Sequence, residues 1–329
     1  MSFTRRNALQ AAAASTLMAG IGRNAWAQAQ IETARIITGF AAGGTSDTIC
    51  RRVAQKLQGD FAKTAVVENK TGAGGQIAVQ TVKAAAPDGA NILQTPTSIL
   101  TIYPHIYKKL AYEPLVDLTP VTLGCVFDFG LAVGPAVPLN VKTVPEFLAW
   151  AKVNPLGANF GSPAAGSTPH FIGALLGKNA GVDLKHAAYR GTQPAMLDLL
   201  GGNVSAVSGP IGDLTQHLPT GKVRILGVSG AKRNRFAPDV PTYEEQGIKN
   251  ATHSEWFAFF LPGGASDATI ERGAASVRQA ASDAELGTAL AGLAIVASAS
   301  SPAQMADRIA AERQHWTPII RAAGITVNS

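Results

Sequence analysis

The stretch ARIITGFAAGGTSDTICRRVAQKL, residues 34–57, decides the fold that we expect for this chain. Its first part, Ala34–Phe40, is rich in β-branched and apolar residues and predicts a strand. Its last part, Ser46–Leu57, predicts a helix because Ile49 and Val53 fall on one face of it. A glycine-rich turn joins the two, which makes a strand–turn–helix unit typical of α/β proteins.

The same alternation continues along the chain. A strand over Ala65–Glu68, a helix over Gln76–Ala86 and a strand over Ile92–Thr95 follow the first unit. This βαβαβ order predicts a mostly parallel sheet with helices on both of its faces.

A second block of alternating elements begins near residue 143. Thr143-Val144-Pro145-Glu146 has the form of a capping box with proline in the first turn, which predicts a helix through Lys152. Thr242–Glu245 is a similar helix start, and a long final helix is expected from Ser301. Further strands are expected over 158–161, 186–189, 204–208 and 224–228, and further helices over 168–179 and 194–200.

Two long apolar runs stand apart from this alternation. Val121–Val133 and Trp256–Leu261 are the best candidates for strands that cross between two lobes. Each lobe is then assembled from separate pieces of chain: 28–124 with 255–329 form one lobe, and 125–254 form the other. The expected fold class is therefore α/β, a two-lobed clamshell of the periplasmic binding protein type, with parallel-rich central sheets and a ligand in the cleft.

The N-terminus carries the three parts of a secretory signal. Arg5 and Arg6 form a positive region, Ala8–Ile21 is mildly apolar, and Ala25-Trp26-Ala27 has the small-x-small form of a cleavage site. We expect residues 1–27 to be removed and the mature protein to be soluble in the periplasm.

The export route stays open at this point. The region around Arg5 and Arg6 looks like a twin-arginine signal, but Ala8 stands where phenylalanine is usual and Gln10 where lysine is usual, so a general secretory route is the other choice. An ordinary amphipathic N-terminal helix is a further alternative. No cysteine follows the apolar run, so no lipid anchor is expected, and the mature chain has no apolar run of the about 20 residues that a membrane span needs.

Composition restricts the partners. The 329 residues are 46% hydrophobic and 15% charged, which is typical of a globular protein with one large domain or two ordinary ones. The formal net charge of +6 falls to +3 once Arg5, Arg6 and Arg23 leave with the signal. No basic run is present, so nucleic acid is not an expected partner. Cys50 and Cys125 either pair in an oxidising compartment or stay as buried thiols.

Four strand-to-helix turns are rich in glycine, serine and threonine. Helix N-termini carry unpaired N–H groups and a partial positive charge, and glycine lets the backbone approach a ligand closely. Such turns hold anions without a charged side chain, although each one alone is also explained by turn formation and helix capping. The turns are 40–47, 69–75, 161–168 and 189–194.

Catalytic and cofactor motifs are missing from the sequence. It contains no P-loop, no G-x-G-x-x-G fingerprint, no H-E-x-x-H and no G-x-S-x-G, and its six histidines lack a metal-ligand spacing. We therefore expect no cofactor, no metal and no enzymatic activity. His170, near a helix start, is interpreted as a structural residue or one behind the ligand contacts. Tyr189 and Arg190 are either ligand contacts or a core aromatic and a surface charge.

At these turns the sequence resembles the Bug, or TctC-like, receptors of tripartite tricarboxylate transport systems, over nearly the whole mature chain. The turns depart from the family pattern at two places: Ala41 replaces the proline of Phe-Pro-x-Gly-Gly, and Ala188-Tyr189-Arg190-Gly191 replaces Pro-Tyr-Lys-Gly. The matching segments include Ile37–Asp47, Val67–Gln76, Asp117–Val121, Asn159–His170, Ala188–Gly202 and Arg235–Gly247.

The resemblance implies two α/β lobes that close on one carboxylated ligand, a monomer, and a partner that is a tripartite tricarboxylate permease or a sensor protein. The ligand-binding positions that it implies are Phe40, Ala41, Gly43, Ser98, Ser162, Ser167, Thr168, His170, Tyr189, Gly191, Thr192 and Asp213.

The function expected from these observations is capture of a small carboxylate in the periplasm, for uptake or sensing. Amino acids, aliphatic dicarboxylates and aromatic acids all stay open as ligands. The alternative is a secreted α/β enzyme that acts on a small carboxylic acid, and a third is an interaction protein with an empty cleft.

Overall fold

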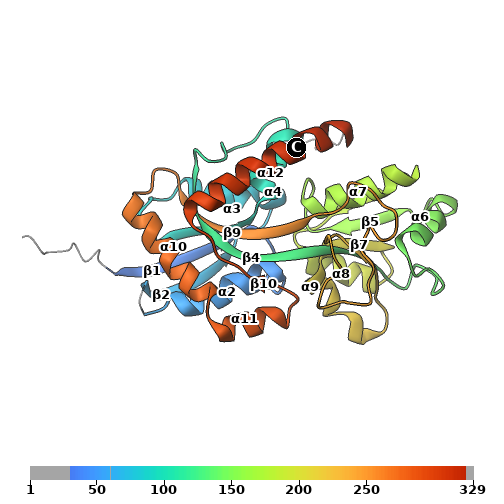
Figure 1. The fold of residues 1–329 in the computed structure, drawn as a ribbon, viewed down its shortest axis with the longest axis horizontal. Helices are drawn as coiled ribbons and strands as arrows, with labels where there is room; N and C mark the ends of the chain where they lie inside the picture. The colour runs from blue at the N-terminus through green and yellow to red at the C-terminus, as the bar shows by residue number, and fades with distance from the viewer. Residues whose placement is uncertain (1–29, 60, 324–329) are drawn as a thin grey trace, which may run out of the picture.

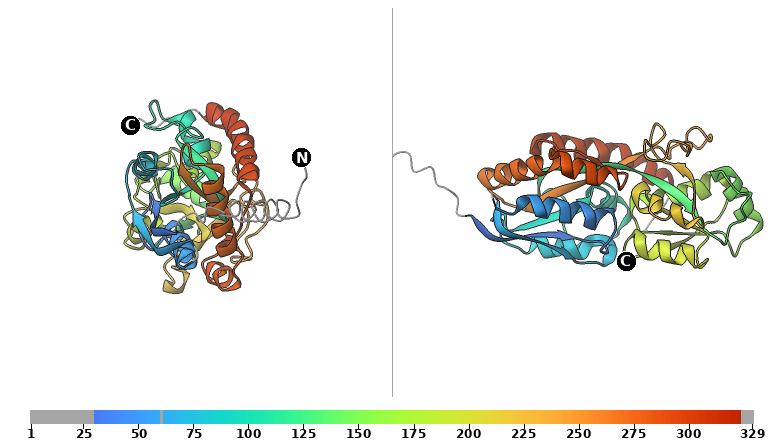
Figure 2. Two further views of the ribbon diagram at one scale, coloured as in Figure 1. Left: turned by 90° about the vertical axis from the view of Figure 1, so that its left-hand side faces the viewer. Right: turned by 90° about the horizontal axis from the view of Figure 1, so that it is seen from below.

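A computed structural model describes residues 30–59 and 61–323 of the chain, so the expected signal at 1–27 lies outside the described residues. Two groups of strands and helices lie side by side, and one long strand passes from the first group into the second (Figure 1). The view from below in Figure 2 shows the same two groups at opposite ends of the molecule. The chain therefore forms the two predicted lobes, and the run Val121–Val133 crosses between them as expected. The other run, Trp256–Leu261, lies within the first lobe, just after the second crossing.

The first lobe begins with the predicted βαβαβ unit. Strand β1 (Ile31–Thr38) pairs in parallel with β2 (Ala62–Asn69) on one side and with β3 (Asn91–Pro96) on the other. Helices α2 (Thr45–Leu57) and α3 (Gln76–Lys83) connect these strands. Ile49, Val53 and Leu57 of α2 are all buried, which confirms the apolar face read from the sequence.

The rest of the first lobe comes from the C-terminal part of the chain. Strand β9 (Ser254–Pro262) inserts between β3 and the long strand β4 (Leu118–Val133), antiparallel to both. The short strand β10 (Val296–Ala297) pairs with β4 as well. The helices of this lobe beyond α2 and α3 are α4 (Ser98–Thr101), α5 (Tyr103–Ile106), α10 (Asp267–Ala281), α11 (Ala284–Ala291) and α12 (Pro302–Ala323).

The second lobe is built on the far half of β4. There β4 pairs antiparallel with β7 and β8, and the parallel strands β5 and β6 continue the sheet beyond β7. The predicted capping box at Thr143 forms and starts α6. The strands are β5 (Asn159–Ser162), β6 (Lys185–Ala188), β7 (Ala206–Pro210) and β8 (Arg224–Val228), and the helices are α6 (Val144–Val153), α7 (Thr168–Ala180), α8 (Thr192–Leu200) and α9 (Ile211–Thr215).

The chain crosses between the lobes at two places. Along β4 the pairing partner changes from β9 to β7 and β8 between Asp128 and Phe129. The second crossing lies at 253–254, because the His253 N–H donates to Ser229 O (2.7 Å) in the second lobe while β9 starts at Ser254 in the first. Division of the chain into 28–124 with 255–329 and 125–254 stays our proposal; strand pairing puts the first change of lobe at 128/129, four residues later than this division, and the second at 253/254.

Helix α12 lies over the junction of the two lobes (Figure 1). Its Trp316 ring packs edge-on against Phe171 of α7 in the second lobe, with ring centroids 5.3 Å apart. Its Glu312 accepts a hydrogen bond from the indole N–H of Trp256 on β9. The last helix therefore contacts both lobes at the place where the chain crosses.

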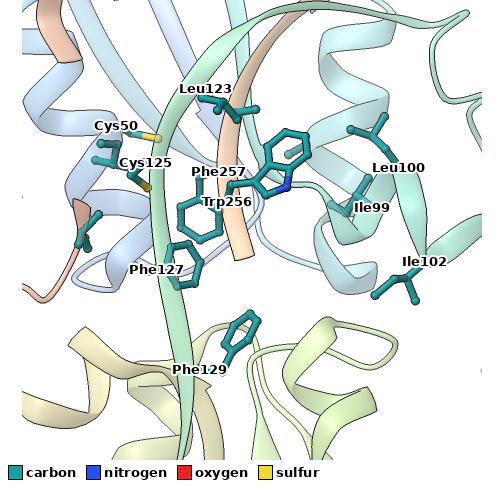
Figure 3. Packing of buried hydrophobic residues seen from close by; sticks show 14 of the residues in the cluster. Cys50, Ile99, Leu100, Ile102, Leu123, Cys125, Phe127, Phe129, Trp256 and Phe257 are labelled. Carbon is teal, nitrogen blue, oxygen red and sulfur yellow. The ribbon is translucent and has the colours of Figure 1, made fainter. Parts of the chain in front are cut away.

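The core of the first lobe surrounds β4 and β9. Figure 3 shows Trp256 on the side of β9 that faces α4, with Leu123 of β4 close by, and Phe257 on the other side of β9, next to Phe127. Cys50 of α2 and Cys125 of β4 lie on the other side of β4 in the same view, and both are free, buried thiols. The sequence left open whether Cys50 and Cys125 form a disulfide or stay as buried thiols, and in the structure they are buried thiols.

The helix predicted to start after Thr242 does not form, so this prediction is wrong. The capping hydrogen bonds do form, from the Thr242 N–H to Glu245 Oε2 (2.7 Å) and from the Glu245 N–H to Thr242 Oγ1 (3.0 Å). The chain turns away after one turn, because Gly247 adopts a φ of 78° and the Ile248 N–H closes onto Tyr243 O. The sequence analysis did not predict α10 and α11, which cover the first lobe.

Candidate ligand-binding cleft

A cavity lies where the two lobes and the crossing strands meet. Its volume is about 40 Å³, which is room for about three ordered waters, so the lobes are close together in this structure. The first lobe lines it with Phe40, Ala41, Gly44, Thr45, Ser46, Pro96 and Ser98, the crossing segments with Phe127, Phe129, Glu255 and Phe257, and the second lobe with Pro163, Ser167, Gly191, Thr192, Pro210 and Asp213.

Two helices, one from each lobe, begin at this cavity. Helix α2 starts after Gly44 and α8 starts after Gly191, and neither glycine supplies a side-chain cap. In contrast, α7 is capped by Ser167, whose hydroxyl accepts from the His170 N–H. Uncapped N–H groups carry the positive end of the helix dipole, so α2 and α8 direct two weakly positive ends at one cavity.

The first and fourth turns touch each other across the cleft. The Ala41 N–H donates to the carbonyl of Arg190 (3.0 Å). Gly191 adopts a φ of 128°, and a Cβ there would lie 3.2 Å from the Ala41 backbone nitrogen. Glycine is therefore needed at 191 both for the backbone conformation and for the close approach of the two turns.

Asp213 of α9 reaches across the cleft to the start of α2. Its Oδ1 accepts from the Thr45 N–H and from the Thr45 hydroxyl, both at 2.8 Å. Burial raises the pKa of the Asp213 carboxyl, and hydrogen bonds from Thr45 and Thr192 partly offset that rise. The N-terminus of α2 thus already holds one carboxylate, supplied by the opposite lobe.

Glu255, the second residue of β9, makes a similar link. Its two carboxylate oxygens accept from Thr97 Oγ1 of the first lobe and from Thr168 Oγ1 of the second, each at 2.6 Å. Burial raises the pKa of the Glu255 carboxyl. The pKa of Glu312 is raised by its own burial and then by the charge of Glu255.

Three phenylalanines of the crossing segments form an aromatic wall. Phe127 and Phe129 lie two residues apart on β4, with ring centroids 5.5 Å apart and planes at 85°. Phe127 also meets Phe257 of β9 edge-on, with centroids 4.6 Å apart. Figure 3 shows the three rings in a row where β4 runs from the first lobe into the second. All three line the cavity.

Seven of the twelve positions that the resemblance implied lie on this cavity in the structure, and five do not. The seven are Phe40, Ala41, Ser98, Ser167, Gly191, Thr192 and Asp213. The five are Gly43, Ser162, Thr168, His170 and Tyr189, each of which has a place beside the cavity or behind it.

Three of those five support the loops rather than line the cavity. Thr168 bonds Glu255, as described above. The Gly43 N–H donates to Asp47 Oδ2 (3.0 Å) within the first turn. The Tyr189 hydroxyl donates to Asp198 Oδ2 (2.7 Å), and burial together with this bond raises the pKa of Tyr189 to about 12.

The remaining two, Ser162 and His170, contact His186 or stack on it behind the third turn, where both histidines are half-buried. His170 and His186 stack with ring centroids 3.8 Å apart, and the Gly166 N–H donates to His170 Nδ1 (2.9 Å). His186 Nε2 shares a 2.7 Å hydrogen bond with the Ser162 hydroxyl. Burial lowers the pKa of His170 to about 4 and, with the neighbouring His170, that of His186 to about 3. Both rings are therefore neutral at pH 7 and hold the loop.

Sequence reasoning missed Thr45, Glu255 and the three phenylalanines of the wall. A signal existed for the phenylalanines, since Val121–Val133 and Trp256–Leu261 were expected to cross between lobes and the cavity lies at the crossing. Nothing in the local sequence marked Glu255, whose role depends on threonines brought together by the fold.

The chemistry available in the cavity is anion binding. Backbone N–H groups and the hydroxyls of Ser98 and Thr192 are donors, whereas the Ser167 hydroxyl donates to Ala164 O. Phe127, Phe129 and Phe257 provide apolar surface. Within residues 30–59 and 61–323, no group of three or more His, Cys, Asp or Glu side chains is placed to hold a metal ion. None of the helices described is long and apolar enough to span a membrane.

Two lobes joined by crossing strands, with a cavity lined by helix N-termini, define a solute-binding protein of the clamshell type. A sequence model described as the tripartite tricarboxylate transporter family receptor matches residues 49–325, and the chain belongs to this family. Family membership confirms the resemblance read from the turns.

Individual relatives agree. The UPF0065 protein in the tcbD-tcbE intergenic region of Pseudomonas sp. (strain P51) is 31% identical over 282 residues, which cover 85% of this chain and 83% of that protein. The solved structure of the periplasmic binding protein BugD has a TM-score of 0.82 at 27% identity and covers 90% of this chain and 98% of its own. The structure of R. palustris Rpa4515 with adipate has a TM-score of 0.84 at 25% identity, with coverage of 90% and 98%.

Proposed function

We propose that this protein is a periplasmic receptor that captures a small carboxylate in the cleft between its lobes. The observation that carries the proposal is the convergence of two helix N-termini with glycine as the N-cap residue, those of α2 and α8, on one cavity, where α2 already binds the Asp213 carboxyl. Helix N-termini are preferred sites for carboxylates because unpaired N–H groups and the helix dipole act together. The adipate-bound relative, which is similar over 90% of this chain, supports a carboxylate as the ligand.

In this proposal the ligand carboxylate accepts hydrogen bonds from backbone N–H groups of the first and fourth turns and from cavity hydroxyls. The positions that we assign to the site are the twelve implied by the family resemblance, with Thr45 added: the seven on the cavity and Thr45 as ligand contacts, and the other five as supports of the loops. The cavity holds about three waters in the present conformation, so a ligand of several carbons enters when the lobes move apart. Closure then buries the ligand between the lobes, in the manner of hinged binding proteins.

We further propose that the protein is exported by the signal at residues 1–27 and acts as a monomer. Its partner is a permease of the tripartite tricarboxylate type for uptake, or a sensor protein for signalling. Pull-down of the ligand-loaded receptor with each candidate membrane partner separates these two roles.

Ligand-dependent stabilisation tests the proposal. The mature chain is screened by thermal unfolding against aliphatic, aromatic and amino acids, and each hit is measured by calorimetry. A ligand at 100 times its Kd raises the free energy of unfolding by about 2.7 kcal/mol. If no carboxylate in a broad panel shifts the unfolding temperature, the proposal is wrong.

A variant locates the site. Thr192→Val removes one cavity hydroxyl with little change in shape, and the affinity for the ligand falls about tenfold or more, as expected for the loss of a hydrogen bond to a charged group. Thr81→Val is the matched control, since Thr81 is half-buried on α3, lies outside the cavity lining and donates to Ile77 O of its own helix. If the two variants bind the ligand with equal affinity, the ligand carboxylate does not contact the Thr192 hydroxyl.

A further inference from the structure

We propose that the cleft selects acids with a single carboxylate and an apolar, preferably aromatic, body, and discriminates against dicarboxylates. This inference rests on the proposed function and narrows its ligand class. The charge of the cavity lining, the position of the nearest cations and the aromatic wall each support it.

The charged residues that line the cavity are Asp213 and Glu255, and both are acidic. Their oxygens already act as acceptors: Asp213 for Thr45, and Glu255 for Thr97 and Thr168. Both side chains are buried, so solvent screens them weakly. One ligand carboxylate has helix N-termini to bind, but a second would lie near these two acids with no group of opposite charge.

The cations nearest to the cleft are engaged or exposed. Arg51 pairs with Asp47 (2.9 Å) within α2 and does not line the cavity. Arg308 lies over the Trp256 ring, 4.9 Å from its centroid, and faces Glu312. The backbone carbonyl of Arg190 accepts a hydrogen bond from the Ala41 N–H, and the residue is exposed. No lysine, arginine or histidine belongs to the cavity lining among the described residues.

The apolar lining fits the rest of such a ligand. Phe40, Phe127, Phe129 and Phe257 come from three different segments, and Pro96 and Pro210 extend the apolar surface. The edge-on arrangement of Phe127 with its two neighbours leaves ring faces and edges for an inserted ring. The two acids of the lining, Asp213 and Glu255, are buried and supply no positive charge for a charged distal group.

Two matched pairs of acids test the inference on the full mature protein. Hexanoate and adipate share six carbons, and benzoate and terephthalate share a ring, so each pair differs by one carboxylate. By calorimetry at pH 7, we expect the monocarboxylate of each pair to bind at least about tenfold more tightly, and benzoate more tightly than hexanoate.

Two variants test the aromatic wall. Phe129→Leu weakens benzoate several-fold and hexanoate less, because a ring contact is lost. Phe147→Leu is the control: Phe147 is equally buried on α6 but lies outside the cavity lining, so ligand affinities stay unchanged. If Phe129→Leu does not fold, the affinities of the wild-type protein for the two pairs of acids still test the inference.

The outcomes separate this inference from the proposed function. If adipate and terephthalate bind as tightly as their monocarboxylate partners or more tightly, the inference is wrong, but the protein is still a carboxylate receptor. If Arg190→Ala then loses this dicarboxylate binding, Arg190 is the residue that binds the second carboxylate. Binding of amino acids but of none of the four probes overturns the inference as well. Failure of every carboxylate overturns the proposed function and the inference together.

Discussion

At the scale of single residues, the cleft depends on two buried carboxylates held by hydroxyl groups. Asp213 and Glu255 each link the lobes, through Thr45 in one case and through Thr97 and Thr168 in the other. Neither carboxyl has a cation as its partner, and burial raises the pKa of both. These side chains therefore influence both the closing of the lobes and the choice of ligand.

The half-buried histidines His170 and His186 give stability a pH dependence. The pKa values of His170 and His186 are lowered from 6.5 to about 4 and about 3 by burial, so folding favours their neutral forms. Their contribution is fully present above pH 6.5 and is lost as pH falls through these lowered values. The raised pKa values of Asp213 and Glu255 act in the opposite sense, since their contribution is lost as pH rises.

A substitution isolates the histidine contribution. We expect the wild type to lose free energy of unfolding relative to His186→Gln as pH falls from 6.5 towards 3, because glutamine does not titrate. Urea unfolding of both proteins at a series of pH values measures this difference, with pH 8 as the reference where both histidines are neutral. A difference that stays constant with pH would contradict the expectation.

The two cysteines provide a second residue-scale prediction. Burial raises the pKa of Cys125 to about 12 and that of Cys50 well above its usual value, so both stay protonated and unreactive in the folded protein. We expect Ellman's reagent to detect no thiol in the native protein and two after denaturation. Two unreactive cysteines in the denatured, unreduced protein would instead mean a disulfide.

At the scale of elements, helix α7 shows how closely the second lobe is packed. A Cβ at Gly173 would lie 2.2 Å from a ring carbon of Phe160, so α7 can approach β5 only because residue 173 is glycine. At Gly287 of α11, by contrast, no atom lies within 4 Å of the place that a Cβ would occupy.

These two glycines form a matched pair. Gly173→Ala lowers the free energy of unfolding by about 1–3 kcal/mol, because overpacking forces the helix off the strand. Gly287→Ala is neutral or raises it by about 0.5–1 kcal/mol, because alanine is the better helix former. Chemical denaturation measures both, and a loss of similar size in both variants would refute the packing explanation.

The elements also show what sequence could and could not predict. The βαβαβ unit was predictable because its helices carry regular apolar faces, as Ile49 and Val53 show in α2. The helix after Thr242 was not, because capping residues do not reveal that Gly247 turns the chain away one turn later. In the site, glycine and hydroxyl patterns marked the turns, but an apolar run cannot show which of its side chains face a cavity, so the wall of Phe127 and Phe129 was missed.

At the scale of the whole molecule, the two crossings connect the lobes through β4 and the start of β9. The structure has a cavity of about 40 Å³, and hydrogen bonds connect the lobes across it. Opening requires the hydrogen bonds of Asp213 to Thr45 and of Ala41 to Arg190 to break, since both bonds cross the cleft.

We therefore expect the protein to be more extended without ligand than with it. Small-angle X-ray scattering of the mature protein should give a smaller radius of gyration when the best carboxylate from the thermal screen is added. The variant Thr192→Val, at the same ligand concentration, should show a smaller change because its affinity is lower. An unchanged radius in the wild type at saturating ligand would argue against movement of the lobes.

The insertion of β9 between β3 and β4 has a consequence for how the protein folds. Residues 91–96 and 118–128 lie on either side of a strand formed by residues 254–262, which is made much later. Until that strand arrives, the nascent first lobe exposes two unpaired strand edges, which are sites of aggregation. The second lobe, whose strands are continuous in sequence, has all its partners earlier and is expected to fold first. Loss of the C-terminal third would therefore destroy the lobe that the N-terminus begins.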